Sequence, residues 1–388
     1  MKEIQKYLKT NHLDGWLLYD FRGQNPTALL ALGAAKRMLT RRWFYFVPAS
    51  GQPVLLAHAI EHDNFPALPG KKVTYAGWEL LQKRLTELLM GSKRLAMEYC
   101  PMGTIPYLSR VDAGTIELVR SYGVEVVSSS DLVQYFLCRW TPDQVESHRR
   151  AAQAINAAKD GAYEFIGQEV QRGHTPLETE VQDFLMARFH DAGLITDHPP
   201  IVAVGPHAGN PHYSPSTTTP TPIKKDDLVL IDLWAKENDP LAVYADITWT
   251  GYVGQQPPER YGEVFNIVAR ARDLGLNYLA QEHRAGRTLK GFEVDRKVRD
   301  YIAAAGYGPY FIHRTGHSIG AHAVHGDGAN LDDLETHDER ELVKGLGFSI
   351  EPGIYLPDFG IRSEIDVFLD SDGPKVFTPI QQEIVAIF

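Results

Sequence analysis

Residues 228–250, LVLIDLWAKENDPLAVYADITWT, predict the central hairpin of the fold. Two apolar, strand-like runs flank the turn sequence Asn-Asp-Pro at 238–240. If the chain turns about Asp239, then Asp232 and Asp246 lie directly opposite each other, with Cβ atoms about 4.5–5.5 Å apart. The flanking residues are so apolar that we expect this hairpin to be buried on both faces. Because like charges placed opposite each other destabilise a sheet, the pair must share a proton, contact water or bind a cation.

A second acidic hairpin follows near the C-terminus, at 346–368, LGFSIEPGIYLPDFGIRSEIDVF. Glu351 and Glu364 stand nearly symmetrically about the turn at 357–358, again within apolar strands. Four converging carboxylates with nearby imidazole form a mixed oxygen and nitrogen ligand set that suits Mn, Co or Zn. Four carboxylates can also bridge two ions about 3.5–4 Å apart and so activate a water. The residues therefore predict a hydrolase with a dinuclear metal site.

Histidines are concentrated in the same part of the chain, since nine of the fifteen lie between His198 and His337. They come mainly from 207–213, HAGNPHY, and from 313–325, HRTGHSIGAHAVH. Glycines at 316 and 320 bracket His317, which allows backbone to approach a ligand closely. For any one of these histidines, a hydrogen-bonding role at the surface or in the core remains the alternative.

The order of the acidic residues and His317 resembles the five-ligand set of the pita-bread metallopeptidases. It is most similar to their proline-peptidase branch, first the prolidases (Xaa-Pro dipeptidases) and next aminopeptidase P. The phrases ADIT, TGHSIG, SIEPGIY, GIRSE and the earlier PHY match the motifs of that family. The resemblance implies an α+β pita-bread catalytic domain at 142–388, preceded by a smaller α/β creatinase-like N-terminal domain at 1–138.

The resemblance also implies a role for each metal ligand. Asp232 chelates one ion, Asp246 and Glu364 bridge both ions, and His317 and Glu351 complete the second ion. Glu351 in addition relays a proton during catalysis. Two divalent ions per chain are expected, with Mn first and Co or Zn as alternatives.

Three further residues are implied to contact the substrate. His212 and His325 steady the tetrahedral intermediate, although one extra residue after His317 leaves His322 as an alternative to His325. Arg362 either anchors the free carboxylate of a dipeptide or orients the metal-binding carboxylates. The sequence departs from the family at Trp249, where arginine is usual, among other positions.

The resemblance predicts a metal-dependent peptidase that cleaves Xaa-Pro dipeptides. An aminopeptidase that acts on longer Xaa-Pro peptides is the alternative, and a homodimer is expected from the family. A serine hydrolase built on Ser318 within GHSIG is a remote alternative, because that motif requires a following helix. A peptide-binding homologue without catalysis is disfavoured because all five ligands are present.

The composition limits the class of protein and its partners. The 388 residues are 44 % hydrophobic and 23 % charged, which is typical of a globular protein of two or three domains. The net charge of −10 disfavours nucleic acid as a partner. No apolar run is long enough to cross a membrane, and two cysteines are too few for a disulfide framework, so a cytoplasmic protein is expected.

The element pattern changes near residue 140. The first segment alternates strands and helices and predicts a largely parallel sheet; the second opens on a long helix and closes on β structure. Predicted strands are 16–20, 43–47, 53–58, 95–99, 124–128, 228–235 and 242–250, and predicted helices are 2–11, 79–90, 106–122, 143–169, a helix ending near 192 that is capped by Thr175, 258–284 and 292–305.

Overall fold

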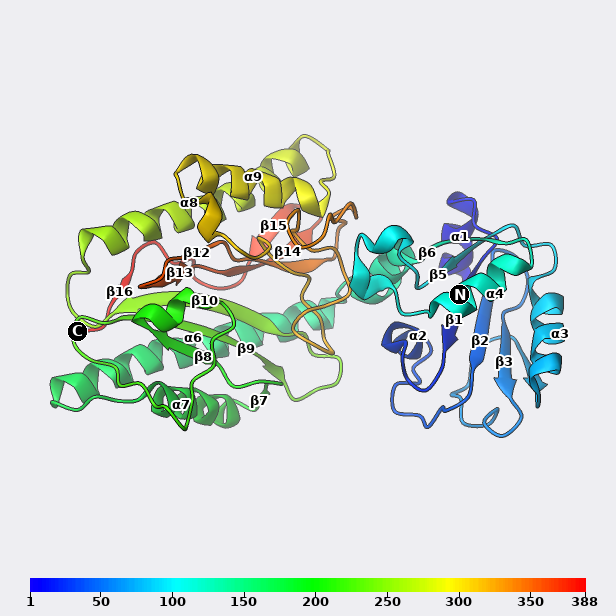
Figure 1. Ribbon diagram of the computed structural model, residues 1–388, viewed down its shortest axis with the longest axis horizontal. Helices are drawn as coiled ribbons and strands as arrows, with labels where there is room; N and C mark the ends of the chain where they lie inside the picture. Colours follow the sequence, from blue (N-terminus) through cyan, green and yellow to red (C-terminus); the bar gives the residue numbers. More distant parts are fainter. The chain divides into compact units, whose positions relative to one another are not determined.

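The computed structural model describes all 388 residues. The chain divides into two compact units, Met1–Leu137 and Cys138–Phe388 (Figure 1). None of the helices combines the length and the apolar composition that spanning a membrane requires.

The first unit is built on one sheet of six strands. Its elements are α1 (Lys2–Thr10), β1 (Gly15–Asp20), α2 (Pro26–Ala31), β2 (Trp43–Pro48), β3 (Val54–His58), β4 (Lys71–Tyr75), α3 (Trp78–Leu89), β5 (Arg94–Met97), η1 (Pro101–Gly103), η2 (Pro106–Leu108), α4 (Ala113–Ser121), β6 (Glu125–Ser128), α5 (Ser130–Val133) and η3 (Gln134–Cys138). The strand order is β4-β3-β2-β1-β5-β6. Only β2 runs antiparallel to its neighbours, so the sheet is largely parallel, as the sequence predicts.

Helices of this unit bury leucines and valines against the sheet. Leu81, Leu85 and Leu89 recur every four residues on α3 and are all buried, which gives that helix its apolar face. The predicted helix at 106–122 is shorter in the structure because Asp112 caps α4, accepting the N–H of Thr115 at 2.9 Å.

The second unit carries two pairs of helices around a group of sheets. Its elements are α6 (Pro142–Gln171), α7 (Glu178–Asp191), β7 (Leu194–Ile195), β8 (Ile201–Val204), η4 (Gly205–Gly209), β9 (Leu228–Glu237), β10 (Ala245–Tyr252), α8 (Glu259–Arg284), α9 (Gly291–Ala304), η5 (Gly308–Tyr310), β11 (Gly347–Ile350), β12 (Gly353–Tyr355), β13 (Gly360–Arg362), β14 (Ile365–Asp370), β15 (Gly373–Val376) and β16 (Val385–Ala386). The long strands β9 and β10 form its centre, with β16 beside β10 and with β7 and β8 beside β9.

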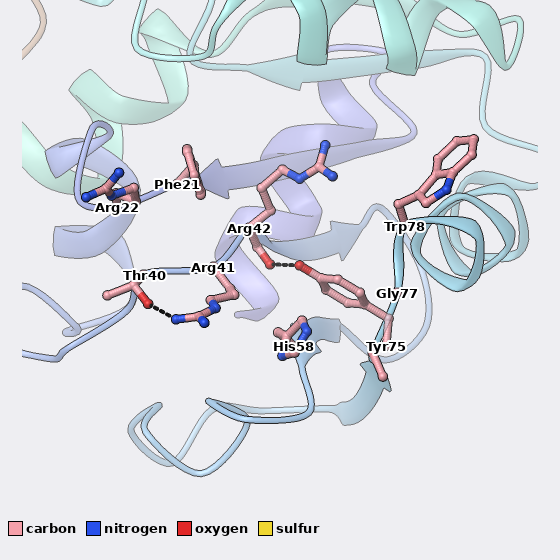
Figure 2. A pocket seen from close by; sticks show the side chains of 10 residues that line it. Phe21, Arg22, Thr40, Arg41, Arg42, His58, Tyr75, Gly77 and Trp78 are labelled. Carbon is pink, nitrogen blue, oxygen red and sulfur yellow. Dashed lines mark hydrogen bonds between the residues drawn. The ribbon is translucent and has the colours of Figure 1, made fainter.

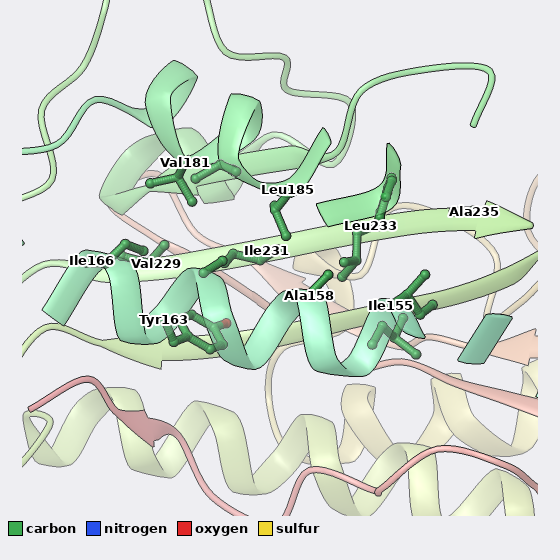
Figure 3. Close-up of a cluster of buried hydrophobic side chains, with 14 of the residues drawn as sticks. Ile155, Ala158, Tyr163, Ile166, Val181, Leu185, Val229, Ile231, Leu233 and Ala235 are labelled. Carbon is green, nitrogen blue, oxygen red and sulfur yellow. The ribbon is translucent and has the colours of Figure 1, made fainter. Parts of the chain in front are cut away.

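One face of β9 forms the core under α6 and α7 (Figure 3). Alternate residues of a strand point to the same face, so every second residue of β9 packs against these helices. Asp232 lies between two of them and therefore points to the opposite face of the sheet. The labelled members of this core are Ile155, Ala158, Tyr163, Ile166, Val181, Leu185, Val229, Ile231, Leu233 and Ala235.

The opposite side of the unit is covered by α8 and α9 (Figure 1). Val294 of α9 and Leu279 of α8 pack with Phe348 of β11 and Val367 of β14 in a second apolar cluster. The two sheet groups meet where the backbone N–H of Glu364 donates to the carbonyl of Thr248 at 3.1 Å. The acidic residues of both hairpins are thus held between two apolar layers.

The start of α7 differs from the prediction. Thr175 does not cap this helix, which begins at Glu178 after Leu177. The preceding residues are instead paired with the segment at 221–223, where the N–H of Ile223 donates to the carbonyl of Pro176 at 2.7 Å. A tertiary contact, which the local pattern does not contain, therefore displaces the predicted cap.

Candidate functional site

The first hairpin has a different register from the predicted one. Asp232 pairs with Thr248, and Asp246 pairs with Trp234, so the two aspartates are not direct cross-strand partners. The chain turns about Pro240 rather than Asp239, which shifts the pairing by two residues. A shift of two keeps both carboxylates on the same face, because side chains alternate with a period of two. The aspartates are therefore diagonal neighbours on that face.

The second hairpin keeps the predicted symmetry. Ile350 pairs with Ile365, and Gly353 pairs with Arg362, although Pro352 interrupts the ladder between them. Continuing this register through the interruption places Glu351 opposite Glu364. The two glutamates thus meet where β11 and β14 give way to β12 and β13.

His317 reaches these carboxylates from the irregular segment between η5 and β11. The carbonyl of His317 accepts the N–H of Ser349 at 2.9 Å, and its own N–H donates to Ser349 Oγ at 3.0 Å. The preceding residue, Gly316, makes this approach possible, since a Cβ there would lie 2.0 Å from the carbonyl oxygen of Ser349. The close approach at Gly316 is to the backbone of β11, whereas the sequence predicts an approach to a ligand.

We expect Gly316→Ala to destabilise the protein by about 1–3 kcal/mol, because the methyl group forces the His317 segment away from β11. Gly262→Ala is the matched control, since Gly262 lies in α8 with nothing within 4 Å of an added Cβ. That control should be neutral or stabilising by up to ~1 kcal/mol. Urea unfolding of both variants measures the difference, and equal stabilities would contradict the packing argument.

The carboxylate and imidazole atoms converge. One ligand atom each from Asp246, His317 and Glu364 lies within 4.8 Å of the others. Nε2 of His317 is 3.5 Å from Asp246 Oδ2 and 3.4 Å from Glu351 Oε1. Two buried oxygens, Asp246 Oδ1 and Glu364 Oε1, have no hydrogen-bond partner.

The ligand atoms that this cluster offers fit a divalent cation. Nδ1 of His317 lies 3.0 Å from the carbonyl of Ser318, which can only accept, so the ring proton is on Nδ1 and Nε2 offers a lone pair. That lone pair faces carboxylate oxygens, which are also acceptors. Acceptors that face one another in a buried site are satisfied by a metal ion.

Burial and mutual repulsion shift the pKa values of these groups. Burial, followed by the neighbouring carboxylates, raises the pKa of Asp246 and of Glu364 well above their usual range. Burial raises the pKa of Glu351 to about 7, and the charge of Arg362 opposes that shift. Burial lowers the pKa of His317 well below its usual value. Bringing these four groups together without a cation therefore costs free energy at neutral pH.

Arg362 is tied to the carboxylates by a hydrogen-bonded network. Its Nη2 donates to Asp232 Oδ2, and its Nε donates to Thr248 Oγ1 at 3.0 Å. Thr248 Oγ1 in turn donates to Glu364 Oε2 at 2.7 Å. Nη1 donates to Tyr355 Oη at 3.0 Å. One buried guanidinium thus positions two of the predicted ligands.

The cluster opens into a cavity of about 1160 Å³. All eight predicted site residues line this cavity: Asp232, Asp246, His317, Glu351, Glu364, His212, His325 and Arg362. His322 does not line it, and Ser318 is buried outside it, where its Oγ accepts the N–H of Gly328 at 3.1 Å. No helix follows Ser318, so the structure lacks the turn into a helix that a serine nucleophile motif requires.

Several residues of the site were not predicted. Asp366 accepts the backbone N–H of Asp246 at 2.7 Å, and Arg314 lines the cavity with Nη2 3.3 Å from His325 Nδ1. The alternation of Glu364 and Asp366 along one strand could have indicated Asp366. No local signal separates Arg314 from an ordinary surface arginine.

Two tryptophans of the first hairpin, Trp249 and Trp234, lie on its opposite faces. Trp249 packs into the core under α6, where Nζ of Lys159 is 3.3 Å from the ring centroid. Trp234 instead lines the cavity and donates from Nε1 to Asp197 at 2.7 Å. Trp234 therefore shapes the site, whereas Trp249 stabilises the layer behind it.

Comparison with known proteins agrees with this geometry. The model of metallopeptidase family M24 matches residues 146–371. An "Xaa-Pro dipeptidase" from Lactobacillus helveticus is 29 % identical over 248 residues, which cover 64 % of this chain and 61 % of that protein. The chain thus spans less than two thirds of the length of the Lactobacillus relatives that it matches.

Solved structures show the same fold over the whole chain. Dipeptidase PepE from Mycobacterium ulcerans has a TM-score of 0.73 at 22 % identity and covers 100 % of this chain and 96 % of its own. A prolidase from Thermococcus sibiricus has a TM-score of 0.67 at 24 % identity, with coverages of 99 % and 97 %. The predicted fold, a pita-bread catalytic unit after a smaller α/β unit, is confirmed.

Proposed function

Since this chain belongs to metallopeptidase family M24, we propose that it hydrolyses Xaa-Pro dipeptides with the help of divalent metal ions. The single observation that carries the proposal is that two partnerless carboxylate oxygens, on Asp246 and Glu364, belong to residues that converge with His317 at the wall of a peptide-sized cavity. The name of the Lactobacillus relative supports the choice of substrate.

Five residues would hold the metal: Asp232, Asp246, His317, Glu351 and Glu364. Two ions per chain are proposed, with Mn first and Co or Zn as alternatives, because the ligands are mostly carboxylates. A divalent ion bound there supplies a water of lowered pKa and a Lewis acid for the scissile carbonyl.

Glu351 is proposed to carry the proton. Its Oε1 accepts from Ser349 Oγ at 3.0 Å, which fixes the carboxylate beside the cluster. A carboxylate fixed beside the reacting groups can accept a proton from water and give it to the leaving proline nitrogen. The proline nitrogen needs this proton because it departs as an amine.

His325 is proposed to donate to the substrate. Arg314 Nη2 can only donate, so Nδ1 of His325 accepts and its ring proton lies on Nε2. Desolvation, with a contribution from Arg314, lowers the pKa of His325 to about 4, which keeps the ring neutral. A neutral ring with Nε2–H is a hydrogen-bond donor for the carbonyl oxygen as it gains charge. His212, which lines the same cavity, is proposed as a second contact to the substrate.

We propose different roles for the two arginines of the cavity. Arg362 is 4 % exposed and already bound to Asp232, Thr248 and Tyr355, so we assign it to orienting the carboxylates. Arg314 has no carboxylate within ion-pair distance and is therefore available to bind the free carboxylate of a dipeptide. That carboxylate is one residue from the scissile bond, and His325, which touches Arg314, lies with its ring centroid 4.0 Å from that of His317.

We expect Arg314→Gln to raise KM for an Xaa-Pro dipeptide about 10- to 100-fold, because a charge-assisted hydrogen bond contributes roughly 1.5–3 kcal/mol. The same variant should leave KM for the corresponding Xaa-Pro amide nearly unchanged, since the amide has no carboxylate to anchor. Arg362→Gln should instead lower kcat for both substrates. If Arg362→Gln raised KM for the dipeptide and Arg314→Gln did not, Arg362 would be the residue that binds the substrate carboxylate.

Substrate length tests the proposed function itself. The wild-type protein should cleave Xaa-Pro faster than Xaa-Pro-Xaa, because the third residue removes the carboxylate from its binding position. Equal or faster cleavage of the tripeptide would favour an Xaa-Pro aminopeptidase.

A further inference from the structure

A second cavity, of about 610 Å³, lies entirely within the N-terminal unit (Figure 2). It sits at the edge of the sheet where β1, β3 and β4 end, at Asp20, His58 and Tyr75. Strand β2 is antiparallel and therefore begins at this edge, directly after Arg42. In sheets of this kind, ligands bind outside the carboxyl ends of the parallel strands.

The lining of this cavity is strongly basic. Arg22, Arg41, Arg42 and His58 contribute to it, and no aspartate or glutamate does, although the whole chain carries a net charge of −10. Arg22 and Arg42 form no ion pair, and the ion pair of Arg41 with Glu61 is a long one of 3.8 Å. The cavity therefore carries two guanidinium charges, those of Arg22 and Arg42, that form no ion pair.

Buried partners fix the backbone around these arginines. Asp20 is fully buried and accepts the N–H groups of Gly23 and Asn25 at 2.9 and 2.7 Å. Between Asp20 and Gly23, Arg22 adopts a φ of 61°, a backbone conformation that residues with a side chain disfavour. On the other side of the cavity, Tyr75 Oη donates to the carbonyl of Arg42 at 2.6 Å (Figure 2).

Glu61 completes this fixed framework. Its carboxylate accepts the backbone N–H groups of Thr40 and Arg41, each at 3.0 Å. It also accepts the hydroxyl of Thr40 at 2.6 Å. Glu61 thus fixes the backbone at Thr40 and Arg41, and the Arg41 guanidinium in turn donates to Thr40 Oγ1 at 2.7 Å.

Aromatic side chains supply flat walls to the same cavity. Trp78 is 63 % exposed, which is unusual for so large an apolar ring, and Phe21 is 37 % exposed. Trp78 is also the first residue of α3, a helix of 12 residues whose N-cap, Gly77, provides no side-chain cap. The N–H groups of that helix end carry a partial positive charge beside the arginines, which Glu79 in the first turn partly offsets.

We propose that this cavity binds a small phosphorylated compound with a planar aromatic ring, a ligand of the nucleotide class. Three arginines and a helix N-terminus match the double charge of a phosphate better than the single charge of a carboxylate. The exposed ring of Trp78 provides a stacking surface for the base. The volume lies within the range of ordinary small-molecule sites. The proposal is independent of the peptidase activity, because every residue that it uses belongs to the first unit.

Calorimetric titration of the full-length protein with ADP tests this proposal. We expect saturable binding of ADP that Arg42→Gln weakens at least about tenfold, as for a lost charge-assisted contact. Arg37→Gln is the matched control, since Arg37 lies on the same connection, is exposed and does not line the cavity. It should change the affinity less than about twofold, as expected for a distant charge screened by salt.

Pyrophosphate and adenosine separate the contribution of the phosphate to binding from that of the aromatic ring. Trp78→Leu should weaken ADP but not pyrophosphate, and adenosine should not bind measurably. Thermal unfolding of each variant shows whether it is folded. Equal affinity of the wild-type protein for pyrophosphate and ADP, absence of ADP binding at 1 mM, or unaltered binding by a folded Arg42→Gln variant would each overturn the proposal.

Discussion

Replacing Glu364 by glutamine should lower kcat/KM for an Xaa-Pro dipeptide at least about a thousandfold, which corresponds to ~4 kcal/mol of transition-state stabilisation. Glu364 is 2 % exposed, and Thr248 holds one of its oxygens while the other has no partner. An amide in its place keeps the shape but removes the charge and turns one acceptor into a donor. The variant should therefore bind less metal, which elemental analysis of the purified protein measures alongside the kinetics.

Glu263→Gln provides the matched control for this loss. Glu263 is exposed on α8 and makes no ion pair, so the same change of side chain should leave activity within about twofold, as for most surface substitutions. Treatment of the wild-type protein with a chelator should reproduce the defect of Glu364→Gln, and added Mn²⁺ should reverse it in the wild-type protein. Full activity of the metal-stripped protein would refute the metal-dependent mechanism.

The second large effect is on stability: in the metal-free protein, the carboxylates of the site should oppose folding more strongly as pH rises from about 5 to 8. The folded-state pKa of Glu351 is raised from 4.5 to about 7, and those of Asp246 and Glu364 move in the same direction. A raised folded pKa gives stability that is fully present below the unfolded pKa and is lost as pH rises through the folded value. The shift of Glu351 alone corresponds to about 3 kcal/mol at most.

Thermal unfolding at several pH values, with chelator or with Mn²⁺, measures this effect. Bound metal stabilises the ionised carboxylates, so the difference in Tm between the two conditions should grow with pH. Titrating groups outside the proposed metal site act in both conditions and cancel in that difference. Glu364→Gln should flatten the pH dependence of the chelated protein. A difference in Tm that stays constant or shrinks between pH 5 and 8 would contradict the assignment of these carboxylates to a shared metal site.

Regular elements of this fold were predictable because their signals are local. The helices at α8 and α9 and the strand β9 agree with the prediction to within about two residues, which is the usual scatter of element ends. The short strand β4, with the polar sequence KKVTY, was not predicted, because it is an edge strand that exposes most of its side chains. Its pairing with β3 depends on residues distant from its own sequence.

The acidic residues of the site show the same contrast between local sequence signals and contacts with distant residues. That Asp232 and Asp246 share one face follows from the period of a strand, and this held even though the register was wrong by two residues. The choice between Asp239 and Pro240 as the turn centre depends on how loop 238–244 packs, which no hairpin rule contains. Arg362 likewise had two open roles until its partners on three different strands were visible.

The sequence by itself determined the kinds of candidate ligand, their order along the chain and the apolar strands that carry them, because alternation and composition are properties of neighbouring residues. Only the tertiary structure decided the register of the first hairpin, the commitment of Arg362 to Asp232, and the availability of Arg314 beside His325. It also gathered Arg22, Arg41 and Arg42 around a cavity in the first unit. These outcomes depend on contacts between distant segments, and such contacts are set by the packing of whole layers rather than by any local pattern.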